Sequence, residues 1–304
     1  MTDRPAVLLM AYGTPSGLDD VEAYYTHIRR GRPPPPELLD ELVGRYRAIG
    51  GRSPLLEITH QQAAGLQERL GIPVHVGQKH AAPFIADAVA DMAAAGTTNL
   101  VGLVLAPHFS KMSIGDYERR ARLAAEEHNW DGELHMVDSW HLEPGFIKLL
   151  ARRIEEARAM LPGEANSRTR VVFTAHSLPA SIVKEGDPYA EQLEATAAAV
   201  ASALDLEDWT IGFQSAGRTA DPWIGPDLLD VIDSMADEGV TGAIVCPCGF
   251  VADHLEVLYD VDIEAMDRAN SRGIALVRTK SPNADSDFLD VLASVAREAL
   301  DASA

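Results

Sequence analysis

The sequence has little cysteine, no long apolar run and a large excess of negative charge. Two cysteines occur among 304 residues, Cys246 and Cys248. They offer no disulfide framework and cannot supply the four ligands of an ordinary iron–sulfur cluster, so no such cluster is expected. No apolar run approaches the roughly 20 residues of a membrane span, and the apolar segment near the start is too short for a secretory leader. A cytoplasmic protein without stable membrane insertion is therefore expected.

The formal net charge of −20 argues against a nucleic-acid-binding face, because phosphates would be repelled. Arginine is nevertheless concentrated in one short segment that contains no lysine: Arg29, Arg30, Arg32, Arg45, Arg47 and Arg52. Guanidinium groups recognise planar anions such as carboxylates through paired hydrogen bonds. An equally acceptable interpretation is that these are surface arginines paired with nearby acids of the same segment, Glu37, Asp40 and Glu41. Composition does not separate the two.

Apolar runs and helical periodicities alternate along the chain. Short buried strands are predicted at 6–11, 73–78, 99–105, 133–137, 170–175, 209–214, 243–246 and 274–278. Helices are predicted between them, and a last one at about 285–300. This rhythm predicts an α/β protein with two doubly wound parallel sheets. The breaker-rich stretch 162–167 suggests domains at 1–165 and 166–304, with the C-terminal helix able to pack back on the first.

Polar side chains follow most of the predicted strands. Tyr12 ends the first, and the others are followed by Lys79-His80, His108, His176, Gln214-Ser215 and Glu256. Parallel strands deliver such groups to one edge of a sheet, where ligands of α/β proteins bind. Two sheets facing each other would then enclose a single cleft. One histidine at a strand end is usually structural, but several converging with a carboxylate indicate a site.

Three carboxylates recur every four residues after the strand 243–246: Glu256, Asp260 and Glu264. On a regular helix starting near Asp253 they would share one face. They serve solubility, or they bind or conduct a cation, and these residues favour neither. The sequence contains no GxGxxG, Walker A, GxSxG, CxxC or HExxH pattern. A metal-handling enzyme and an anion-binding module of periplasmic-receptor type both remain open at this point.

Several long motifs resemble the ferrochelatases, and more closely the coproporphyrin III ferrochelatases of Gram-positive bacteria. They are LLMAYGTP (8–15), YYTHIRRGRPPPPELL (24–39), RYRAIGGRSPL (45–55), LAPHFS (105–110), AHSLP (175–179), DPWIGP (221–226) and GFVADHLEVLYD (249–260). The resemblance covers the chain in order from about Val7 to Leu292. It implies two Rossmann-like domains with a porphyrin cleft between them. It also implies insertion of Fe2+, as substrate, into coproporphyrin III to give coproheme in heme biosynthesis, with protoporphyrin IX as the alternative substrate.

The resemblance assigns roles residue by residue. It implies that His176 and Glu256 face the porphyrin nitrogens, bind iron and accept pyrrole protons, with Tyr12 on the opposite face as an axial ligand. Residues matching positions that hold the porphyrin and its propionates are Arg29, Arg45, Tyr46, Ser53 and Tyr117. Arg45, Asp260 and Glu264 match a second, outer cation site of some members, for which Mg2+ is the candidate ion. Lys79 and His80 match a pair at the cleft edge.

The resemblance also bears on partners. It implies a monomer that contacts coproheme decarboxylase transiently when it hands on its product. Some actinobacterial members carry a [2Fe–2S] cluster, for which this chain lacks the cysteines. Members that dock on membranes have an apolar lip near the first helices, whereas this chain is rich in arginine and proline there.

Overall fold

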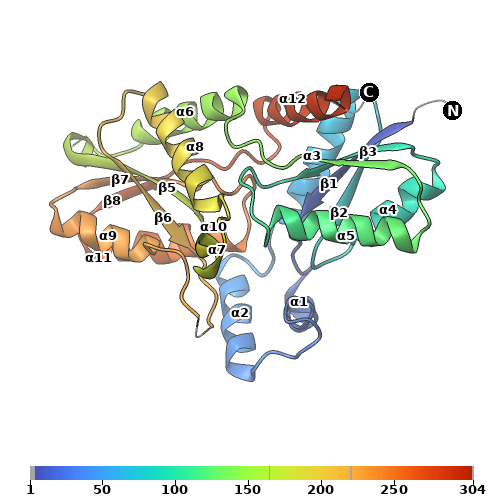
Figure 1. Ribbon diagram of the computed structural model, residues 1–304. Coiled ribbons are helices and arrows are strands. Elements are labelled where there is room, and N and C mark those ends of the chain that lie inside the picture. The colour runs from blue at the N-terminus through green and yellow to red at the C-terminus, as the bar shows by residue number, and fades with distance from the viewer. Residues whose placement is uncertain (1–3, 164, 220, 303–304) are drawn as a thin grey trace.

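The computed structural model describes residues 4–163, 165–219 and 221–302, and it contains two parallel sheets of four strands each (Figure 1). The first has the order β2-β1-β3-β4, formed by β1 (Pro5–Ala11), β2 (Val74–Gln78), β3 (Asn99–Val104) and β4 (Glu133–Met136). The second has the order β6-β5-β7-β8, formed by β5 (Thr169–His176), β6 (Trp209–Gln214), β7 (Gly242–Cys246) and β8 (Ala275–Arg278). The predicted fold class is confirmed.

Helices cover the sheets, so the central strands are mostly apolar, and residues 6–10 of β1 are fully buried. The first half contains η1 (Leu18–Asp20), α1 (Val21–Ile28), α2 (Pro36–Ala48), α3 (Leu55–Leu70), α4 (Ile85–Ala94), α5 (Ile114–Glu127) and α6 (Pro144–Arg158). The second half contains η2 (Ala165–Arg168), α7 (Ser181–Lys184), α8 (Tyr189–Ala203), α9 (Leu228–Asp237), α10 (Leu255–Leu258), η3 (Asp260–Ala265), α11 (Met266–Ser271) and α12 (Ser286–Ala302).

Two helices pack against the half of the molecule to which they do not belong in sequence. α6 precedes the predicted junction at residue 165, yet it packs against α8 and β7 of the second half. α12 lies at the end of the chain and packs on α3 of the first half, as Figure 1 shows at its top. One apolar cluster accordingly runs from Leu9 and Leu103 in the first sheet through Phe146 and Phe288 to Phe173 in the second. The exchange of helices ties the halves together, and the division 1–165 and 166–304 stays a proposal.

The helix predicted from Asp253 is not regular. α10 is a single turn, and the chain then widens into the π-helix η3 before it returns to α geometry in α11. π-Helical turns are rare and recur at functional sites. The prediction of a uniform α-helix with evenly spaced carboxylates is therefore wrong in this region.

α1 and α2 project from the first half below the junction of the two sheets (Figure 1). The proline run 33–36 stops any helix between them, and Pro36 takes the first turn of α2, where its missing N–H costs nothing. This places α1 and α2, and with them Arg45, beside the carboxyl ends of the central strands.

Candidate active site

A cavity of about 610 Å³ opens between the halves at the carboxyl ends of the central strands. In each sheet the first strand of that half lies between the second and the third, so the direction in which strands are added reverses beside it. Open α/β sheets bind ligands at such a switch point. Aromatic and imidazole rings form a large part of the lining, which suits a large planar ligand. They belong to Tyr12, Tyr24, Tyr25, Tyr46, His108, Tyr117, His176, Tyr189, Trp223, Phe250 and His254.

His176 lies at the end of β5 and about a third of its side chain is exposed, toward the cavity. Its backbone carbonyl accepts a hydrogen bond of 3.0 Å from the Tyr189 hydroxyl. Its ring Nδ1 contacts the Ser177 carbonyl, which can only accept a hydrogen bond, so Nδ1 carries a proton. The orientation leaves Nε2 as the atom available to a metal ion or a proton.

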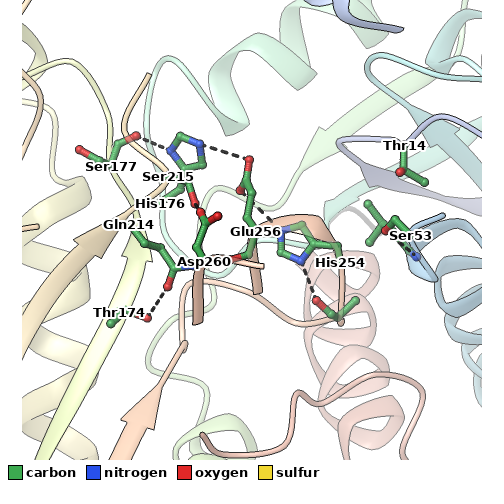
Figure 2. A network of polar contacts seen from close by, with 12 residues as sticks. Thr14, Ser53, Thr174, His176, Ser177, Gln214, Ser215, His254, Glu256 and Asp260 are labelled. Atoms are coloured by element: carbon green, nitrogen blue, oxygen red, sulfur yellow. Dashed lines mark hydrogen bonds and ion pairs between the residues drawn. The ribbon is translucent and has the colours of Figure 1, made fainter. Parts of the chain in front are cut away.

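The His176 ring faces a carboxylate. Its Nε2 lies 3.5 Å from Oε1 of Glu256 (Figure 2). Burial by itself would lower the pKa of His176, but the Glu256 carboxylate and the Ser177 carbonyl outweigh it and raise the pKa to about 8. Burial would likewise raise the pKa of Glu256, yet the charge and hydrogen bonds of its histidine neighbours hold it well below its usual range. At neutral pH the resting pair is thus imidazolium and carboxylate.

The second oxygen of Glu256 has a partner that the sequence analysis missed. Oε2 lies 3.5 Å from Nε2 of His254, whose Nδ1 is 2.9 Å from the Ala252 carbonyl. His254 caps α10 in an extended conformation, so it and Glu256 come to the same side of the chain. The sequence signal that could have predicted this contact is the His-x-Glu pattern of His254 and Glu256, at the start of a helix after a buried strand.

Close backbone packing fixes Glu256 beside His176. Gly249 of the loop after β7 lies so near β5 that an added Cβ would be 2.5 Å from Cβ of Ala175, and only glycine fits there. The Gly249 amide donates to the Thr174 carbonyl at 3.0 Å. From β6, the Gln214 side-chain amide donates to the backbone carbonyl of Glu256 at 2.7 Å. Three neighbouring strands thus position this one carboxylate.

The next two carboxylates, Asp260 and Glu264, both contact the guanidinium of Arg45 on α2. Arg45 Nη1 is 3.2 Å from Asp260 Oδ1, and Nη2 is 3.7 Å from Glu264 Oε1. Ser215 donates a further hydrogen bond to Asp260. Burial nevertheless raises the pKa of Asp260 to about 7, with help from the Glu256 charge. Asp260 lines the cavity, whereas Glu264 is 37% exposed and lies outside the lining.

The tyrosines stay neutral phenols. Desolvation and then the Glu256 charge raise the pKa of Tyr12, which lies at the end of β1. Burial raises the pKa of Tyr46 to about 12, against a hydrogen bond with Thr14, and it moves the pKa of Tyr117 well upward. Because Glu256 acts on all three, its negative field extends across the cavity and favours a cation inside it.

Of the other predicted site residues, Ser53 lines the cavity and Arg29 does not. Ser53 lines the cavity beside Tyr46, and its hydroxyl accepts the Leu55 amide at 3.2 Å at the start of α3. Arg29 is not among the lining residues; its guanidinium lies 5.8 Å from the centroid of the Tyr25 ring, and its buried Nε has no partner within the described residues.

The cleft-edge pair is held by charge and ring contacts. Lys79 Nζ lies 2.7 Å from Asp116 Oδ2 and sits over the Tyr117 ring. The His80 ring packs on Tyr12 with centroids 4.7 Å apart, and desolvation together with the charge of Lys79 lowers its pKa to about 3. His80 is therefore neutral.

His108 joins the two halves. It is 1% exposed, and its Nε2 lies 2.9 Å from the Thr196 hydroxyl of α8. Burial lowers its pKa to about 3, so the ring is uncharged. Although it touches the cavity, its contacts make it a structural bridge.

Within the described residues no helix is long and apolar enough to cross a membrane. The likeness to solved structures concerns the fold alone. SirB from Bacillus subtilis, solved with Fe3+, superposes with a TM-score of 0.61 at 12% identity, covering 97% of this chain and 95% of SirB. CbiX, described as the terminal enzyme for siroheme biosynthesis in denitrifying bacteria, gives 0.54 at 15% identity, covering 97% and 98%.

Curated relatives match over nearly their full length. Ferrochelatase of Herpetosiphon aurantiacus is 44% identical over 97% of this chain and 99% of its own. Coproporphyrin III ferrochelatase 2 of Bacillus cereus is 46% identical over 95% and 92%. Coproporphyrin III ferrochelatase of Bacillus subtilis is 43% identical over 96% of each. The ferrochelatase family model matches residues 4–300, and the chain therefore belongs to the ferrochelatase family of metal-inserting enzymes.

Proposed function

We propose that this protein inserts Fe2+ into coproporphyrin III to form coproheme in heme biosynthesis. The observation that carries the proposal is the His176–Glu256 ion pair, placed at the carboxyl end of β5 in a cavity lined by aromatic rings. Relatives in two Bacillus species bear the name of this activity at 43% and 46% identity. Family membership also favours an enzyme over the receptor-type binding module.

The proton balance of the reaction gives the residues their roles. As Fe2+ enters, the porphyrin loses two pyrrole N–H protons, and two protons leave the site. Neutral imidazole can bind iron or accept a proton through Nε2, whereas imidazolium can do neither. The proton on His176 must therefore leave first, and Glu256 at 3.5 Å is the group positioned to take part. Asp260, with its pKa near 7, can take up and release protons at neutral pH.

The other assigned residues would bind the porphyrin. We propose that the phenols of Tyr12, Tyr46 and Tyr117 and the Ser53 hydroxyl contact the macrocycle and its propionates, with Tyr12 opposite His176. All four line the cavity. Arg29, with its unpartnered Nε next to Tyr25, remains a proposed outer propionate ligand.

The outer Mg2+ site receives little support from these residues. Arg45 already lies between Asp260 and Glu264 and compensates their charge. A divalent ion would have to displace the guanidinium and complete its shell with water. The arrangement does not fit a resident ion, and no step of the reaction is assigned to one.

The remaining proposals concern surroundings and partners. We propose a cytoplasmic monomer that contacts coproheme decarboxylase transiently. The two buried free thiols, Cys246 and Cys248, suit a reducing compartment. The expectation that no iron–sulfur cluster is present rests on the count of two cysteines.

The direct test mixes the protein, Fe2+ and coproporphyrin III without oxygen and follows the absorption spectrum. Conversion of the free-base spectrum to that of the iron porphyrin over many turnovers is the expected result. Binding without turnover would refute the proposed function and favour a binding module. Faster conversion of protoporphyrin IX would assign the other porphyrin.

Replacing Arg45 with alanine should raise KM for coproporphyrin III more than for protoporphyrin IX, because the first carries four propionates and the second two. Losing one charge-assisted contact costs roughly tenfold in affinity when it is partly desolvated. Arg29→Ala should act in the same direction but more weakly, since Arg29 is outside the lining. The measurement is kcat/KM for both porphyrins in each variant. Equal losses for the two substrates would show that these arginines support the fold instead.

A further inference from the structure

We propose that Arg218, in the loop between β6 and α9, is a substrate-binding residue that exchanges Glu41 for a propionate of the porphyrin. The proposal rests on the proposed function and names a residue that the sequence motifs did not assign. Arg218 lines the cavity with 62% of its side chain exposed. Its Nη2 lies 2.5 Å from Oε1 of Glu41, which belongs to α2 on the other half.

Arg218 differs from the other cationic side chains of the cavity in having fewer contacts with carboxylates. Besides the histidines they are Arg45, Lys79 and Arg218. Arg45 is shared among Glu41, Asp260 and Glu264, and Lys79 is held by Asp116 at 2.7 Å with little exposure. In the described structure Arg218 has Glu41 as its one carboxylate partner. Freeing Arg218 from its carboxylate partner should therefore cost less free energy than freeing Arg45 or Lys79.

Glu41 has a second cationic partner, Arg45, and therefore keeps one ion pair when Arg218 leaves. Its Oε1 accepts from Arg218 at 2.5 Å and from Arg45 at 3.3 Å, so one carboxylate oxygen serves two guanidinium groups. A propionate arriving at the same place would replace one carboxylate with another, and the net charge of the contact would not change. Exposed ion pairs of this kind contribute little to stability, so the exchange is not opposed by the fold.

The loop that carries Arg218 is anchored and does not have to fold around the ligand. Gly217 lies against the Trp223 indole so closely that an added Cβ would be 2.3 Å from Cζ2 of the ring. The Trp223 Nε1–H donates to the Thr219 hydroxyl at 2.9 Å. Both neighbours of Arg218 thus contact Trp223, so the movement required on binding is mainly that of the long arginine side chain, which limits the entropy lost.

The two members of the pair allow a test that separates binding from structure. If Arg218 binds a propionate, Arg218→Gln weakens porphyrin binding, whereas Glu41→Gln strengthens it by removing the competing carboxylate and its repulsion. If the pair is only a latch between the halves, both substitutions remove the same contact and shift binding in the same direction.

The experiment titrates coproporphyrin III, without iron, into each variant and follows quenching of protein fluorescence. We expect Arg218→Gln to raise Kd about two- to fivefold, with Arg218→Lys in between and protoporphyrin IX affected less. Glu41→Gln should lower Kd by about twofold or more. The matched controls are Arg122→Gln and Glu118→Gln, an exposed pair of α5 at 2.8 Å that is not part of the cavity lining.

An unchanged Kd in Arg218→Gln, or shifts of Arg218→Gln and Glu41→Gln in the same direction, would overturn the proposal. Because the titration contains no iron, its outcome is independent of turnover. A protein that binds coproporphyrin III through Arg218 but never inserts iron would refute the proposed function and leave this inference standing.

Discussion

Replacing His176 with alanine should lower the rate of iron insertion by about 10²–10⁴-fold while porphyrin binding stays close to wild type. The reason is that Nε2 of His176 is the ring atom that faces Glu256 and the cavity, with Nδ1 committed to the Ser177 carbonyl. Porphyrin affinity should stay close to wild type because the tyrosine rings and the charged groups of the lining remain in place when one imidazole is removed.

The measurement is single-turnover insertion of Fe2+ without oxygen, combined with a porphyrin titration of the same variant. The chain offers a matched control in His135, which pairs with Glu133 at 3.3 Å on β4 away from the cavity. His135→Ala should insert iron at the wild-type rate. Near-wild-type turnover in His176→Ala would make His176 structural and would remove the basis of the proposed mechanism.

Replacing Glu256 with glutamine should slow insertion by about 10²-fold or more, because Glu256 contacts both His176 and His254. The effect should decrease along the row of carboxylates. Asp260→Asn should cost about tenfold, since Asp260 lines the cavity and its pKa suits proton transfer near neutral pH. Glu264→Gln should cost about twofold or less, because Glu264 is 37% exposed and its ion pair with Arg45 is long, at 3.7 Å.

Steady-state rates of the three variants decide whether the carboxylates act in this order. Glu133→Gln, on β4, is the control for removing a carboxylate beside a histidine. A larger loss in Glu264→Gln than in Glu256→Gln would contradict a proton path that starts at the His176–Glu256 pair.

The fold follows closely from the sequence because its strands are short apolar runs between breakers. β1 and β7 were predictable for this reason: strands buried on both faces contain little else than apolar residues. The strand-end census also located the site, since parallel strands must bring Tyr12, His176 and Glu256 to one side of their sheets.

Contacts between segments that are far apart in the sequence could not be predicted from such local patterns. The i, i+4 spacing of Asp260 and Glu264 predicted two acids on one helix face, but it gave no sign of their contact with Arg45, which lies more than 200 positions away on α2. The π-helical turn in η3 has no periodicity signal of its own in so short a segment. The packing of α6 on α8 and β7 of the second half depends on which apolar surfaces come together in the folded chain. The local sequence pattern of α6 does not contain this information.

The role of the pair depends on its charge state, which pH controls. In the free enzyme the pKa of His176 is raised to about 8, because Glu256 stabilises the imidazolium more than burial destabilises it. Below this pH the ring is protonated and cannot bind iron, so insertion should rise as pH increases through about 8. Without the Glu256 charge, burial dominates and the pKa of His176 should fall to or below its ordinary value of about 6.5.

The pH dependence of single-turnover iron insertion, in wild type and in Glu256→Gln, therefore tests most directly whether this ion pair controls metal insertion. We expect a rising limb near pH 8 in the wild type. In the slower Glu256→Gln variant the limb should move down by more than about one pH unit. Limbs at the same pH in the two proteins would show that the His176–Glu256 pair does not control the reaction.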